Sequence, residues 1–358
     1  MILFILIVAI FFSVAFPKSK IITLLWGCLL IINVVCTTQS LDALFLEYRY
    51  NQKGFDGFPV LFRKLMDACA QYNLSFLQFK FIYVCIIVVL LFLTIRYLTE
   101  QRAFCMMLIT IYPGWCFSGQ IRNTLGAVLV IFALAFLIES NFKYKKIVYI
   151  ACVVIATLVH PSCILYLLVI FCLKDNVSMS RKFIVFYLAV IVLLYSNGIY
   201  RIVSLFLHNE RVLQYLRMSL TKNIFASLVV ILGQLILTFV IIRQLKMDEA
   251  TNYWDEADSR QEVYDLMIKV NYAFLILIPL YCINHAAFRI YKYLFITNYC
   301  VLSSECYSGR LLRIKNVMLL IAIAFISLML QVTVDGGIGD VFTLFNNLDF
   351  TQLRMVFN

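Results

Sequence analysis

Long apolar runs separated by short polar stretches dominate the chain. A full membrane crossing needs about 20 helical residues, with roughly 17 to 25 tolerated. Several runs are shorter, so some helices must be tilted, be flanked by interfacial residues or stop part-way. Runs bounded by charged or turn residues predict helical spans at Ile2–Phe16, Ile21–Val35, Phe79–Ile95, Ala103–Phe117, Ile121–Ile138, Ile147–Leu173, Phe183–Tyr195, Ile224–Ile242, Leu266–Ile283, Phe288–Leu302 and Val317–Val334.

One predicted span, Ile147–Leu173, is too long for a simple crossing and carries His160-Pro161 near its middle. Proline removes a backbone donor and disfavours helical structure at the residue before it. We therefore expect two short helices that turn at His160. This split gives about 11–12 transmembrane or half-spanning helices in one all-α, polytopic membrane domain over residues 1–358.

Composition supports a membrane class. Of 358 residues, 63% are hydrophobic and 14% charged, and the mean hydropathy is +0.94. A soluble domain is about half apolar and a quarter charged. The net charge of +11 comes from small basic groups between apolar runs, a distribution that orients polytopic proteins and does not call for nucleic acid as a partner. Most cysteines lie inside apolar runs and no C-x-x-C pair occurs, so we expect no metal.

The basic groups predict an orientation. Cytoplasmic loops of membrane proteins carry an excess of Lys and Arg. With these groups inside, both termini, the loop 37–78 and an amphipathic segment 200–222 face outward, whereas the loop 246–265 is cytoplasmic. The N-terminal run lacks the basic start of a cleavable signal, so we interpret it as a retained first helix. The groups are Lys18 and Lys20, Arg96 and Arg102, Lys143 to Lys146, Lys174 to Lys182, Arg243 and Lys246, and Arg310 to Lys315.

Three residues on this predicted outer side are candidates for catalysis: Arg122, His160 and Arg289. A guanidinium is costly at membrane depth and keeps its charge, so such arginines face a polar cavity or a partner. Guanidinium also matches phosphate oxygens in bidentate fashion. A nearby histidine can take a proton from a hydroxyl. Together they suit attack on a lipid-linked, pyrophosphate-activated substrate at the outer leaflet.

Each candidate also has an ordinary structural interpretation. Arg122 could be an interfacial anchor that reaches the headgroups, and His160 could simply end a helix. Arg289 with Lys292 among tyrosines could form an interfacial belt. The basic face of 200–222, which includes Arg211 and Arg217, is typical of headgroup binding. Motifs of soluble enzymes, such as a Walker loop, G-x-G-x-x-G, G-x-S-x-G or H-E-x-x-H, are absent from the sequence, which gives no support to a nucleotide-using enzyme or pump.

The same residues resemble those of a known family. The run G-Q-I-R-N-T-L-G-A, Gly119 to Ala127, resembles the arginine-led helix start of the EpsG-like family of bacterial exopolysaccharide proteins. L-V-H-P-S, Leu158 to Ser162, is similar to that family's H-x-S element. K-G-F-D-G-F-P-V-L-F, Lys53 to Phe62, and N-L-S-F-L-Q-F, Asn73 to Phe79, resemble its external region, and F-R-I-Y-K-Y at Arg289 its later arginine–tyrosine element.

The resemblance implies a GT-C-like, Wzy-type polymerase of O-antigen, capsule or exopolysaccharide. Such a protein joins repeat units carried on undecaprenyl pyrophosphate at the outer (periplasmic) face of the bacterial cytoplasmic (inner) membrane. The implied partners are the lipid-linked glycan donor and acceptor and the bilayer. A chain-length regulator of the same pathway is a further candidate partner. No cofactor is expected. The alternatives are a flippase or exporter of the same lipid-linked glycans and a membrane O-acetyltransferase.

Each of the three candidate catalytic residues has an expected chemical role. Arg122 and Arg289 hold and neutralise the pyrophosphate leaving group, and His160 orients or deprotonates the acceptor hydroxyl. Positive charge near the departing phosphate can replace the divalent metal that soluble nucleotide-sugar transferases often need. Polar residues around these three are expected to bind substrate: Gln120, Asn123, Ser162, Arg211, Arg217 and Tyr293.

Overall fold

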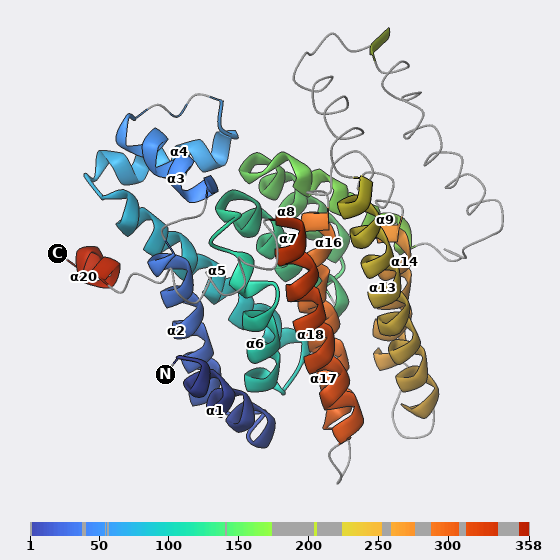
Figure 1. Cartoon of the computed structure of the whole chain (residues 1–358). Helices are drawn as coiled ribbons and strands as arrows, with labels where there is room; N and C mark the ends of the chain where they lie inside the picture. Colours follow the sequence, from blue (N-terminus) through green and yellow to red (C-terminus); the bar gives the residue numbers. More distant parts are fainter. Residues whose placement is uncertain are drawn as a thin grey trace. The chain divides into compact units, whose positions relative to one another are not determined.

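The computed structural model describes residues 2–37, 41–53, 55, 57–139, 142–173, 204–205, 224–252, 259–275, 288–307, 313–335 and 351–357. All regular elements in these residues are helices (Figure 1), as the apolar runs predict. They form two compact units, which are described separately. The first comprises Met1–Leu167, Tyr293–Met329 and Gly337–Asn358, and the second Leu168–Lys292 and Leu330–Gly336.

The first unit is built on apolar helices whose bounds lie close to the predicted runs. Helix α7 contacts α5 and α8, α2 contacts α5 and α6, and α17 contacts α5, α6 and α7. Within the described residues, three segments are long and apolar enough to cross a membrane: Phe76–Leu98, Ile121–Ile138 and Ile314–Val332. The helices are α1 (Ile2–Ala15), α2 (Lys20–Cys36), α5 (Phe76–Leu98), α6 (Arg102–Ile111), α7 (Ile121–Glu139), α8 (Lys145–Val159) and α17 (Leu294–Cys306).

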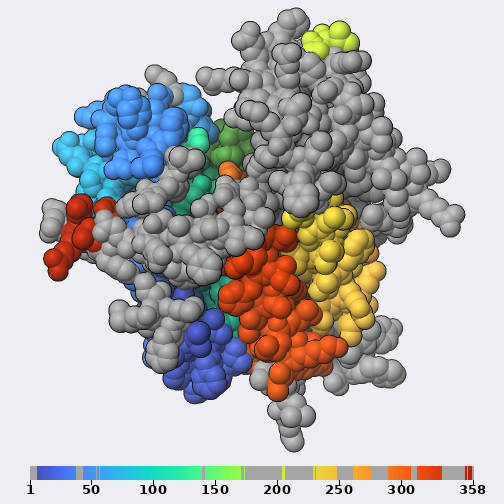
Figure 2. All heavy atoms as spheres, in the orientation of Figure 1, coloured from blue at the N-terminus to red at the C-terminus, as the bar shows by residue number. Residues whose placement is uncertain are grey.

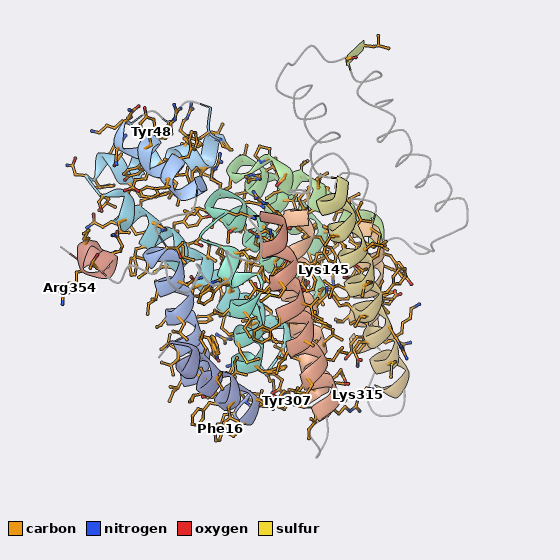
Figure 3. All side chains as sticks on the ribbon, viewed as in Figure 1. Phe16, Tyr48, Lys145, Tyr307, Lys315 and Arg354 are labelled. Atoms are coloured by element: carbon orange, nitrogen blue, oxygen red, sulfur yellow. The ribbon has the colours of Figure 1, made fainter. Side chains whose placement is uncertain are left out.

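One end of this unit gathers the connections that carry basic residues. Lys18, between α1 and α2, forms an ion pair with Glu100, between α5 and α6. The hydroxyl of Tyr307, after α17, donates to the Val14 carbonyl at 3.1 Å. Figure 3 shows Phe16 and Tyr307 together at this end, with Tyr48 of helix α3 at the other. Of the predicted basic groups, Lys18 and Arg102 therefore lie at this end of the first unit, whereas 174–182 lies outside the described residues and Arg243 and Lys246 belong to the second unit.

The opposite end carries a layer of two short helices within the predicted external loop 37–78: α3 (Leu41–Asn51) and α4 (Val60–Gln71). Figure 2 shows this layer in blue, beside the short C-terminal helix α20 (Thr351–Phe357) in red. The Gln78 amide at the start of α5 donates to the Val356 carbonyl at 3.2 Å. We call residues 41–75, which comprise α3, α4 and the turn after each helix, the cap.

Aromatic packing attaches the cap to α5. The ring of Tyr50 stacks on that of Phe79, with centroids 5.5 Å apart. Phe62 makes edge contacts with Phe79 at 6.0 Å and Tyr83 at 6.3 Å. Such aromatic pairs stabilise the folded protein by more than the burial of their surface area alone would. Burial raises the pKa of Tyr50 to about 12, so its hydroxyl stays neutral and donates to the Leu74 carbonyl at 2.9 Å.

A buried lysine joins α5 to the end of α2. Lys80 of α5 is 3% exposed, and its ammonium donates to the carbonyls of Val35 at 3.3 Å and Thr37 at 2.7 Å. Carbonyls at a helix C-terminus lack intrahelical partners and carry the negative end of the helix dipole. The charge of Lys80 is thus compensated by the end of α2.

The second unit contains α9 (Leu168–Cys172), α13 (Ile224–Asn252), α14 (Ser259–Phe274) and α16 (Phe288–Lys292). Helix α14 contacts both α9 and α13. The Tyr291 hydroxyl lies 2.8 Å from that of Thr238 and donates to the Asn271 side-chain carbonyl at 3.4 Å. Helix α18 (Ile314–Asp335) contributes residues to both units.

Several predicted boundaries differ from the observed helices. Polar residues extend α13 to Asn252 and begin α14 at Ser259, so helix occupies most of the predicted loop 246–265. The run Ala103–Phe117 ends as helix at Ile111, before Pro113 and a short 3₁₀ turn, and Phe288–Leu302 breaks between α16 and α17. Nearly all of segment 200–222 and the whole run Phe183–Tyr195 lie outside the described residues.

Candidate functional site

The first turn of α7 carries Arg122 and Asn123, and its conformation is fixed by local hydrogen bonds. The Gln120 carbonyl accepts from the backbone N–H of Thr124 at 3.0 Å and from its hydroxyl at 2.8 Å. The Tyr83 hydroxyl of α5 accepts from the Leu125 N–H at 3.0 Å. The carbonyl of Gln120 therefore accepts the first hydrogen bonds of the helix. The side chain of Gln120 lies inside the unit and is 3% exposed.

Tyr293 holds the same turn from another direction. Its hydroxyl lies 2.9 Å from that of Thr124, and its ring stacks on Phe117 with centroids 6.0 Å apart. The side chain is fully buried. The contacts of Tyr293 therefore position the start of α7, and we assign it a positioning role within the predicted substrate site.

His160 lies where α8 ends, as the sequence predicts. Its backbone is extended (φ −148°, ψ 120°), its N–H still donates to the Ala156 carbonyl, and the 3₁₀ helix η2 (Pro161–Leu167) begins at the next residue. The split of the long apolar run is thus confirmed. A Cβ at Gly126 of α7 would lie 2.7 Å from the Cys163 sulfur and 3.1 Å from the Ala156 carbonyl oxygen. The missing side chain therefore lets the His160 turn approach α7.

The approach brings His160, Ser162 and Asn123 into one hydrogen-bonded chain. The imidazole Nδ1 of His160 lies 2.7 Å from the Ser162 hydroxyl, which donates to the Asn123 side-chain carbonyl at 3.4 Å. A hydroxyl has one proton to donate. With that proton directed to Asn123, Ser162 accepts from Nδ1–H, and the lone pair of the neutral ring is on Nε2. In this arrangement Nε2 is the basic nitrogen of the ring.

Arg122 lies against the cap. Its guanidinium carbon is 5.3 Å from the centroid of the Phe58 ring, within the range of a cation–π contact. The guanidinium of Arg49, at the end of α3, approaches the same ring at 5.8 Å. Phe58 is 9% exposed, and both arginines are half-buried. Residues far apart in sequence thus bring two positive charges to one ring.

The structure distributes the predicted site residues unevenly. Arg122, Asn123, His160 and Ser162 come together in the first unit, with Gln120 and Tyr293 supporting them. Arg289 is half-buried in α16 of the second unit. Arg211 and Arg217 lie outside the described residues. Among the described residues, no three His, Cys, Asp or Glu side chains could hold a metal ion.

Three residues near the candidate site are not among those predicted from the sequence: Arg49, Phe58 and Tyr83. Phe58 belongs to the K-G-F-D-G-F-P stretch that carries the family resemblance, so that motif offered a signal for it. Arg49 is an ordinary cation in a polar segment, and Tyr83 one more aromatic residue in an apolar run. Nothing local distinguishes either of them.

The helices and their charge distribution define an all-α polytopic membrane protein with a polar site at one end of its first unit. The particular family follows from the sequence. A family model described as "EpsG family" matches residues 40–339, which is most of the chain, and the chain belongs to this family. No curated protein and no solved structure matches it significantly. Membership indicates a membrane protein of polysaccharide biosynthesis.

Proposed function

We propose that this protein is a Wzy-type polysaccharide polymerase, a membrane glycosyltransferase that joins oligosaccharide units carried on undecaprenyl pyrophosphate. One observation carries the proposal. Arg122, a cation suited to phosphate, and Asn123, the end of the hydrogen-bonded chain from His160, are neighbours in the first turn of α7. The first turn of α7 therefore carries a cation suited to phosphate and, through Asn123 and Ser162, contacts the proposed proton acceptor His160.

The reaction that these groups support is an acid–base-assisted displacement. The acceptor hydroxyl oxygen forms a bond to the anomeric carbon of the donor sugar, and the bond from that carbon to the pyrophosphate oxygen breaks. The lipid pyrophosphate leaves with the electron pair, and Arg122 stabilises the charge that develops on it. Nε2 of His160 takes the proton of the attacking hydroxyl. No metal or nucleotide enters this scheme.

The displacement described above requires only Arg122 and His160, and the other predicted residues have additional proposed roles. Arg289 is proposed to hold the pyrophosphate together with Arg122. Arg211 and Arg217 are proposed to bind substrate or lipid headgroups. Donor and acceptor glycans reach the site at the outer face of the cytoplasmic membrane, and a chain-length regulator of the same pathway is a further proposed partner.

The outer location can be tested with single cysteines in a background that lacks the native ones. Tyr72→Cys in the cap and Pro161→Cys beside His160 are at exposed positions, as are Glu100→Cys and Tyr144→Cys in connections that carry basic residues. We expect an impermeant thiol reagent added to intact cells to label positions 72 and 161, but 100 and 144 only after permeabilisation. Labelling of position 144 in intact cells would refute the orientation.

A deletion strain separates polymerisation from export. Without the protein, we expect single repeat units to reach the outer leaflet or the final acceptor while long polymer is lost, because units are exported before they are joined. The measurement is the size distribution of surface glycan, together with the leaflet in which lipid-linked units accumulate. Accumulation on the inner leaflet would show that the protein is a flippase. Full-length polymer lacking acetyl groups would show an O-acetyltransferase.

A further inference from the structure

Phe58 contacts two guanidinium groups that come from different parts of the first unit. Arg122 lies at the start of α7 and Arg49 at the end of α3, with guanidinium carbons 5.3 Å and 5.8 Å from the ring centroid. The two charges cannot be farther apart than the sum of these distances. Two guanidinium groups, each suited to a phosphoryl group, therefore lie in one part of the site.

Packing within the first unit holds the segments that carry the two arginines. Phe58 contacts Phe62 of α4 at 6.0 Å, and Phe62 contacts Tyr83 of α5 at 6.3 Å. The Tyr83 hydroxyl accepts from Leu125, one turn from Arg122. On the other side, Arg49 precedes Tyr50, which stacks on Phe79 of α5. Both arginines therefore lie on segments that pack against α5.

We propose that Arg49 is a second phosphate-binding residue of this site, and that the pair Arg49–Arg122 recognises a diphosphate rather than a monophosphate. Each guanidinium offers a planar pair of donors to one phosphoryl group. A diphosphate brings two such groups on one ligand. The lipid-linked identity of the diphosphate rests on the proposed function.

The test measures binding to the purified full-length protein in nanodiscs, with farnesyl diphosphate, farnesyl monophosphate and inorganic pyrophosphate as probes. We expect the wild type to prefer the diphosphate over the monophosphate by on the order of tenfold, the gain of one further charged hydrogen-bonding pair. Arg49→Gln should remove this preference by weakening diphosphate binding about tenfold, with little change for the monophosphate.

Two further variants separate charge from packing. Arg49→Lys keeps both a long aliphatic stem against Phe58 and the positive charge, whereas Arg49→Gln keeps only a shorter, neutral side chain. Arg49→Lys should therefore retain part of the preference. Lys64→Ala removes an exposed cation from the same cap and should bind all three probes as the wild type does. Equal binding by the Lys and Gln variants would overturn the proposal.

The outcomes also distinguish this inference from the proposed function. A wild-type protein without diphosphate preference, or an Arg49→Gln variant that keeps it, refutes the role of Arg49 even if cells still need the protein for polymer. Conversely, a deletion strain that still makes polymer refutes the polymerase while the binding result stands. Inorganic pyrophosphate binding as tightly as farnesyl diphosphate would support the arginine pair but contradict a lipid-linked donor.

Discussion

Replacement of Arg122 by alanine should abolish polymer while the protein still inserts and accumulates. A leaving pyrophosphate gains negative charge as the glycosidic bond breaks, so a fixed cation nearby lowers the barrier more than it tightens substrate binding. Loss of one such group typically costs about a hundredfold to a thousandfold in rate. The measurement is polymer length and amount at matched protein level, or the rate with lipid-linked repeat units and purified protein.

Two comparison variants decide what Arg122 does. Arg122→Lys keeps the charge without the planar fork, so we expect a shortened product in reduced amount. Arg96→Ala removes an exposed arginine near the end of α5 and should leave polymer unchanged. A lipid anchor needs only a long cationic stem. Full activity of Arg122→Lys together with a nearly silent Arg122→Ala would therefore identify Arg122 as an anchor.

Local signals explain which parts of the fold the sequence predicts well. The break at His160 follows from Pro161, whose missing N–H and steric demand act on the adjacent residue. The apolar runs similarly identify helices such as α2, α5 and α7, because a helix solvated by lipid must be apolar along its length. Polar helix ends have no such signature. The sequence therefore does not predict that α14 begins at Ser259, ahead of its apolar run.

The site itself is only partly visible in the sequence. Arg122 and His160 stand out because a charge or a polar turn interrupts an apolar run. Their partners depend on tertiary packing: Phe58 reaches Arg122 only because the cap is attached to α5, and Ser162 reaches Asn123 only because Gly126 lets the two segments approach. A pattern along the chain records none of these distances. The joint action of Arg289 and Arg122 on one pyrophosphate stays a prediction, because the two residues belong to different units of the structure.

Replacement of His160 by glutamine should lower the polymerisation rate by about a hundredfold to ten-thousandfold, the usual contribution of a general base. Glutamine can still hydrogen-bond to Ser162 but cannot take up the hydroxyl proton. Binding of farnesyl diphosphate should stay near the wild-type level, since Arg122 is unchanged. If His160 only ends α8, the glutamine variant should keep most of its activity.

The hydrogen-bonded chain to Asn123 makes this role testable in a second way. Asn123→Leu removes the acceptor for the Ser162 hydroxyl, which can then donate to Nδ1 and so place the ring proton on Nε2. We expect the polymerisation rate of this variant to fall. The wild-type rate should decrease on acidification, because only the unprotonated imidazole accepts a proton, and His160→Gln should flatten this dependence. An unchanged pH profile in His160→Gln would show that another group is the base.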